Sequence, residues 1–142
     1  MRIEEPDLGI YEYQTPATLN QAAPVQNTWY TILDTTTHCR IYEIAVNIED
    51  ANETLEIQVT IDGQTIGATA KAATHSTTYY VYRESDAINR VNTLILDNAL
   101  TKSIRAFQLE GHSVKVEVRK TTAAGAGNLT GIVTYGVLKP IG

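Results

Sequence analysis

Apolar and polar residues alternate one by one along several stretches of this chain, and this alternation is the feature that most constrains its fold. In residues 54–62, four aliphatic side chains alternate with polar ones, and residues 113–120 repeat the pattern. Successive side chains of a β-strand point to opposite faces, so each stretch predicts a strand with one buried and one solvated face. No stretch of the sequence sustains a helical period.

Further strands follow from the same pattern. A third alternating stretch predicts one buried face made of Tyr42, Ile44, Val46 and Ile48. Weaker patterns predict strands at residues 28–33, 77–83, 93–97, 103–109 and 130–138. Asp62 and Gly63 predict a tight hairpin turn after the strand at 54–62, because both residues tolerate the positive φ angles that such turns need. Residues 85–91 are compatible with a single helical turn.

The composition agrees with a chain built from strands. Thr, Ile and Val together make up 44 of the 142 residues, and eight Tyr join them. β-branched and aromatic side chains favour a pleated, half-buried surface. Eight or nine short strands without intervening helices predict an all-β fold, an antiparallel β-sandwich. An eight-stranded jelly roll is the first expectation, and an immunoglobulin-like sandwich is the second.

The first 27 residues differ from the rest of the chain, because they hold three of its four prolines. Proline lacks the N–H group that a central strand needs, so at most short pairing at a sheet edge fits here. We therefore expect an extended N-terminal arm at residues 1–27 and a β-sandwich domain at residues 28–142, with a disordered terminus as the alternative. The candidate anchors for a partner on this arm are Ile10, Tyr11, Tyr13 and Leu19.

Charge and hydropathy exclude several classes of partner. The net charge of −5 argues against nucleic-acid binding, which depends on basic side chains that neutralise phosphates. No segment approaches the roughly 18 continuous apolar residues that a membrane span requires. The acidic start of the chain lacks the apolar stretch of a secretory signal, so synthesis in the cytosol is expected.

A search for catalytic and metal-binding groups yields none. The three histidines, His38, His75 and His112, are far apart in the sequence. The neighbours His38 and Cys39 would point to opposite faces of a strand and could not readily share a metal ion. A Cys39 nucleophile would need His75 or His112 nearby in space as its base and a third group to orient that base, and nothing in the sequence indicates such an arrangement. We therefore predict no catalytic residue, no metal site and no cofactor; a cupin-type metalloenzyme is kept as a rival hypothesis.

The aromatic residues are the remaining candidates for function. Tyrosine suits interfaces because its ring is apolar while its hydroxyl can remain hydrated. Three interpretations stay open for these residues: an oligomer interface, ordinary core, or a platform that stacks on sugars with the help of the loop at 121–128. The residues concerned are Trp29, Tyr30, Tyr79, Tyr80 and Tyr82.

Part of the sequence resembles a known class of proteins. The runs NTWYTILDTT (residues 27–36), RIYEIAV (40–46) and ETLEIQVTIDG (53–63) are similar to small virion structural proteins of tailed phages and related viruses. The resemblance covers residues 27 to 66 and carries no catalytic motif. It implies a jelly-roll or similar sandwich subunit, commonly a homotrimer, that decorates a capsid or forms a fibre or spike.

These observations together predict a non-enzymatic virion protein. The expected role is a capsid decoration (cement) subunit that self-associates, most simply as a trimer. It would bind the major capsid protein or another virion protein through its sandwich and its N-terminal arm. The alternative is a receptor- or carbohydrate-binding fibre or spike module. Neither role involves nucleic acid or a membrane, and a glycan is a possible ligand of the second.

Overall fold

The computed structural model describes residues 9–49, 54–71, 78–83, 93–95, 103–105, 109–122 and 127–140. The expected helical turn at 85–91, His75 and the tip of the loop at 121–128 lie outside these residues. The described chain forms strands only: β1 (Gly9–Tyr13), β2 (Ala17–Gln21), β3 (Tyr30–Thr35), β4 (Cys39–Ile48), β5 (Thr54–Ile61), β6 (Gln64–Lys71), β7 (Thr78–Arg83), β8 (Thr93–Ile95), β9 (Ser103–Arg105), β10 (Leu109–Gly111), β11 (Val114–Lys120) and β12 (Leu129–Pro140).

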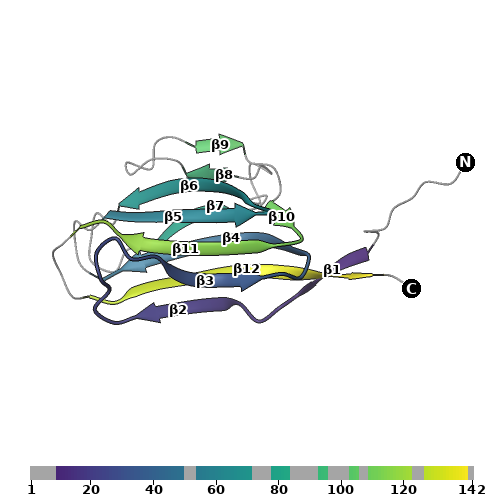
Figure 1. Ribbon diagram of the computed structural model, residues 1–142, viewed down its shortest axis with the longest axis horizontal. Coiled ribbons are helices and arrows are strands. Elements are labelled where there is room, and N and C mark those ends of the chain that lie inside the picture. Colours follow the sequence, from purple (N-terminus) through teal and green to yellow (C-terminus); the bar gives the residue numbers. More distant parts are fainter. Residues whose placement is uncertain are drawn as a thin grey trace, which may run out of the picture.

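The strands form two antiparallel sheets that pack face to face, which confirms the expected all-β, antiparallel architecture. Sheet A has the order β1-β12-β4-β7-β8-β9, with β2 also paired to β12 and β10 also paired to β4. Sheet B has the order β3-β11-β5-β6. Figure 1 looks onto sheet B, with β4 and β7 of sheet A behind it. In the described part of the chain, we find no helix with the length and hydropathy of a membrane span.

The core lies between the sheets and follows the predicted alternation. In β11, Val114, Val116 and Val118 are fully buried, while the residues between them are half-buried. Strand β5 repeats this pattern on the same side of sheet B. These side chains pack on those of β4 and β12, so the period of two that is visible in the sequence is the period of the core.

Four antiparallel pairs are nested along the chain. The first strand of the sandwich pairs with the last, β2 with β12, and the next two pairs inward are β3 with β11 and β4 with β7. The innermost pair is the hairpin β5–β6. Taken in chain order, the eight strands of these pairs alternate between the two sheets, except at the hairpin. Most contacts therefore join residues that are far apart in the sequence.

The predicted face of β4 is interrupted by a β-bulge. Glu43 lies opposite Thr134, and Ile41 lies opposite Tyr135, so Tyr42 is the extra residue. A bulge shifts the alternation by one residue. As a result Ile41 and Ile44 are both buried, while Tyr42 is half-buried on the outer side of sheet A. The expectation that Tyr42 shares the buried face of Ile44 was therefore wrong.

The described part of the N-terminal segment belongs to sheet A. Its residues form two short strands, β1 and β2, that pair with opposite halves of β12. Pro16 falls in the gap between them, consistent with the limit that proline sets on pairing. Leu19 packs on the core, so β2 completes the sandwich. Strand β1 and the end of β12 extend beyond the other strands as a two-stranded projection (Figure 1).

The predicted turn after β5 is confirmed. Asp62 and Gly63 have φ angles of 49° and 85°, and Ile61 pairs with Gln64 across the turn. Both angles lie in the left-handed region, as a type I′ turn requires. Asp62 also fixes the turn to a neighbouring segment, because its Oδ1 accepts hydrogen bonds from the backbone N–H groups of His112 and Ser113 at 2.9 Å.

We expect Gly63→Ala to lower the free energy of unfolding by about 1 kcal/mol, because a Cβ atom is strained at positive φ. No atom lies within 4 Å of the added Cβ, so the loss would come from backbone strain alone. Urea denaturation measures it. The neighbouring exposed position serves as the control: Gln64→Ala should change stability by less than about 0.5 kcal/mol. Equal effects of the two substitutions would contradict this account.

Candidate functional site

The four predicted anchors of the N-terminal segment do not lie on one surface. Ile10 and Tyr13 are 59% and 69% exposed on β1 and are available to a partner. Tyr11 is half-buried and contacts polar residues of its own chain. Leu19 packs on the core. The segment therefore offers an exposed surface on β1 and a structural strand in β2.

The candidate interface aromatics lie in different places. Tyr82 is fully buried in the core and is not available to a partner. Tyr30 packs against the core, and its hydroxyl accepts a hydrogen bond from the backbone N–H of Val25 at 2.9 Å. Tyr79 and Tyr80 lie in β7, opposite Val46 and Ala45 of β4.

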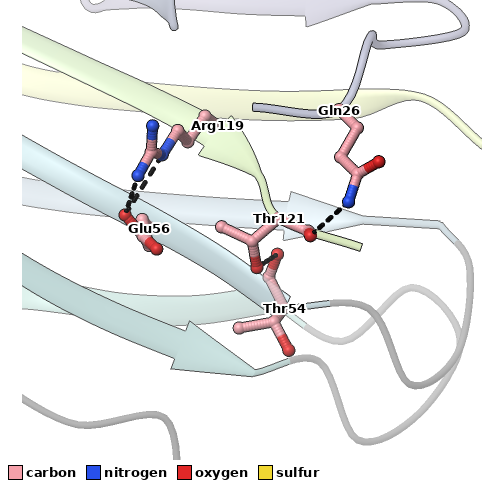
Figure 2. Close-up of polar contacts among 5 residues, drawn as sticks. All are labelled: Gln26, Thr54, Glu56, Arg119 and Thr121. Atoms are coloured by element: carbon pink, nitrogen blue, oxygen red, sulfur yellow. Dashed lines mark hydrogen bonds and ion pairs between the residues drawn. The ribbon is translucent and has the colours of Figure 1, made fainter. Parts of the chain in front are cut away.

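Trp29 lies on the outer side of sheet B, next to a charged pair. The Arg119 guanidinium lies 4.5 Å from the centre of the Trp29 ring and forms an ion pair with Glu56 at 2.8 Å. Figure 2 shows this pair beside a second set of contacts, in which Gln26 donates to the carbonyl of Thr121. Trp29, which directly precedes β3, is thus held by Arg119 of sheet B, and it does not share a surface with the tyrosines of β1.

A recess at the end of sheet A brings polar side chains from four segments together. We call it the tyrosine–histidine recess. It has a volume of about 460 Å³ and is lined by Tyr11, His38, Arg40, Asp62, Glu110, Gly111 and His112. Gly111 permits the close packing of its floor, because a Cβ there would come within 2.6 Å of Ile61 and 2.7 Å of Asp62.

A hydrogen-bonded chain joins β1 to the recess. The Tyr11 hydroxyl donates to Glu110 and lies 3.2 Å from Nε2 of His38. Nδ1 of His38 is buried with no hydrogen-bond partner in the described residues. The rings of His38 and His112 lie 4.4 Å apart.

Burial raises the pKa of the Tyr11 hydroxyl well above its ordinary value, and the hydrogen bond and negative charge of Glu110 add to this effect. Arg40 opposes the shift but does not outweigh it. Tyr11 therefore remains a neutral hydrogen-bond donor at physiological pH. The Arg40 guanidinium lies 5.8 Å from the centre of the Tyr11 ring and 5.6 Å from that of Tyr42, so it sits between two aromatic residues.

An aromatic pair continues this surface beyond Arg40. The rings of Tyr13 and Tyr42 lie 4.7 Å apart and are tilted by 34°. The β4 bulge puts Tyr42 on this side of the sheet, and β1 supplies Tyr13. Tyr11, Arg40, Tyr42 and Tyr13 thus form a connected row, which we call the tyrosine row.

The described residues were also compared with the requirements of a metal site. Among these residues, no three His, Cys, Asp or Glu side chains lie together so that they could hold a metal ion. Cys39 points into the core while His38 faces the recess, as expected for neighbours on a strand. Burial raises the pKa of the Cys39 thiol to about 11, so it stays protonated and unreactive near neutral pH.

The sequence did not reveal the recess, because His38 and His112 are far apart along the chain. The structure brings them together because Gly111 pairs with Cys39 in the β10–β4 ladder. Comparisons of the chain with protein-family models, with curated proteins and with solved structures found no match.

The raised pKa of Cys39 predicts a loss of stability in alkali. An unfolded chain ionises this thiol near pH 8.5, whereas the folded chain does so near pH 11. Its contribution to stability is therefore complete below about pH 8.5 and disappears as the pH rises toward 11. Cys39→Ala should lower stability at pH 7 by creating a cavity, yet flatten its decline between about pH 8.5 and 11. Urea unfolding across this range tests it; an unchanged slope would contradict the assignment.

Proposed function

We propose that this chain is a non-enzymatic virion structural protein, a capsid decoration (cement) subunit that associates with copies of itself, most simply as a trimer. It would bind the capsid shell through its sandwich and its N-terminal segment. The observation that carries the proposal is Ile10, an apolar side chain that is 59% exposed on a strand projecting beyond the sandwich (Figure 1). An apolar side chain that is exposed on a projecting strand gains free energy when a partner removes it from water.

The nested strand pairs support a jelly roll as the finer description of the fold. In that fold eight strands form four antiparallel pairs, first with eighth through to fourth with fifth, across two sheets. Here β2, β3, β4 and β5 would be the first four strands, and β6, β7, β11 and β12 the last four. Jelly rolls serve in viral capsids, lectins and cupins, so the fold alone does not select among these roles.

The position of Ile10 on β1 explains why a partner is needed there. Alternation puts Ile10 on the same face as Glu12 and opposite to Tyr11. Glu12 pairs with Val137, which packs on the core. The side of sheet A that carries Ile10 therefore faces sheet B elsewhere in the molecule, but at β1 this side is left exposed. A second copy of the chain would supply the missing apolar cover.

We expect the intact protein to be a trimer or larger assembly at micromolar concentration, and Ile10→Lys to reduce its mass toward that of the 15.6 kDa monomer. A charged side chain in an apolar contact loses hydration without gaining a partner, which weakens association. Light scattering coupled to size-exclusion chromatography measures the mass. Val25→Lys is the matched control, because Val25 is 62% exposed but lies outside the projection.

A monomeric wild-type protein, or an equal loss of mass in both variants, would contradict the proposed surface. These substitutions are preferable to deleting the N-terminal segment. Such a deletion would remove β2 together with Leu19, expose the edge of β12 and uncover part of the core. Loss of assembly after deletion would then have two explanations, whereas a single exposed position has one.

Capsid binding requires its own measurement. The proposal expects the purified protein to co-sediment with capsids of the virus that encodes it, assembled without this subunit.

A receptor- or carbohydrate-binding fibre or spike module is the second candidate. The specific observation that favours it is the tyrosine row beside the recess, with Tyr13 69% exposed. Self-association without capsid binding would favour this second role.

A further inference from the structure

We infer that the tyrosine–histidine recess, together with the tyrosine row, is a binding site for an uncharged carbohydrate. The inference rests on the second candidate role, the carbohydrate-binding module, and names its class of ligand; it does not depend on the decoration role. It rests on three properties of the surface: an exposed aromatic face, a dense set of hydrogen-bonding groups of both kinds, and a charge balance that disfavours anions.

The aromatic face is supplied by Tyr13. One side of its ring lies against Tyr42, with ring centres 4.7 Å apart, and the residue remains 69% exposed. A large exposed aromatic ring that is already held by a neighbour loses little freedom on binding. Sugars present C–H groups on one face of their ring, which pack on an aromatic surface. Tyr13 thus offers a pre-ordered stacking position.

The recess supplies the polar contacts that such a ligand needs. Glu110 and Asp62 bring acceptors, Arg40 brings donors, and His112 exposes an imidazole at the rim. The volume of about 460 Å³ falls within the range of roughly 300–1,000 Å³ that is typical of small-molecule sites. A ligand with many hydroxyl groups can use donors and acceptors together, whereas an apolar ligand would leave them unpaired.

The charges select for a neutral ligand. Besides its two histidines, the lining carries one basic side chain, Arg40, against two acidic ones, Asp62 and Glu110. An acidic sugar or a phosphate would meet two carboxylates and only one guanidinium. Asp62 is also committed to the backbone of His112 and Ser113, so it stays fixed in the site. The recess therefore favours uncharged sugars over acidic ones.

The site is pre-formed by the contacts that hold β1. Tyr11 links β1 to Glu110 and His38, and Arg40 fills the space between Tyr11 and Tyr42. These contacts place the stacking ring of Tyr13 next to the polar groups without help from a ligand. Because Ile10 points to the opposite face of β1, a ligand at the recess and a partner at Ile10 would not compete.

The test uses the full chain and saturation-transfer difference NMR with maltotriose, mannotriose, chitotriose, N-acetyllactosamine, sialyllactose and trigalacturonate. We expect at least one of the four neutral oligosaccharides to bind, and more tightly than the two acidic ones. Tyr13→Ala should weaken that binding by roughly fivefold to tenfold, the range expected for one stacked aromatic contact. Glu110→Gln should weaken it as well, since it removes a charged acceptor.

Trp29→Ala is the matched control, because it removes an aromatic residue from the outer side of sheet B and should leave the affinity unchanged. Urea midpoints verify that the variants are folded, and the exposure of Tyr13 makes a folding defect of Tyr13→Ala unexpected. The inference is overturned if no neutral oligosaccharide binds, if the acidic ones bind more tightly, or if Trp29→Ala reduces binding as much as Tyr13→Ala. Light scattering of the same samples reports assembly separately.

Discussion

The pairing of β12 with its neighbours on both edges is the interaction on which the rest of this structure depends. One edge of β12 carries β4 over nine residue pairs, and the other edge carries β2 and then β1. Strand β12, the last strand, therefore joins β2, the first strand of the sandwich, to β4 at the centre of sheet A. Gly131 in β12 also allows sheet A to pack closely on sheet B, because a Cβ at this position would lie 2.5 Å from Ile32 of β3. Closure by β12 positions both the core and the recess.

The bulge between β4 and β12 determines which side chains of β4 lie on the outer side of sheet A. Without the extra residue, Tyr42 would continue the buried alternation of Ile44. With it, Tyr42 points outward, where Arg40 and Tyr13 meet it. Bulges commonly redirect side chains in this way near functional sites. One additional residue in one strand therefore produces a buried core on one side of sheet A and an aromatic row on the other.

Features that depend on residues close together in the sequence were predicted, whereas features that depend on residues far apart in the sequence were not. The strand at 54–61 and the turn at Asp62 and Gly63 depend on neighbouring residues, and both were predicted correctly. The bulge left a local trace, because the apolar positions change from odd numbers at Ile41 to even numbers at Ile44. A period that shifts by one within a strand is the signature of an extra residue, and it was open to recognition.

The recess could not be predicted from the sequence, because its side chains belong to segments that come together only through strand register. His38 meets His112 because Gly111 pairs with Cys39, and Tyr11 reaches them because β1 pairs with the end of β12. The candidate aromatic residues were grouped together from the sequence, but the structure separates them. Tyr82 and Trp29 look alike as candidates in the sequence, but one lies in the core and the other beside Arg119 on sheet B. Residue type does not encode that difference; sheet topology does.

An exposed edge strand such as β1 is a hazard as well as an opportunity, since it can pair with any other edge. The sequence limits that hazard in three ways. Strand β1 has only five residues, Pro16 prevents it from continuing into β2, and Glu12 and Lys139 place charges on its surface in an ion pair at 3.2 Å. Only a short contact centred on Ile10 remains apolar. These features leave little unpaired backbone on β1 to which another sheet edge could add.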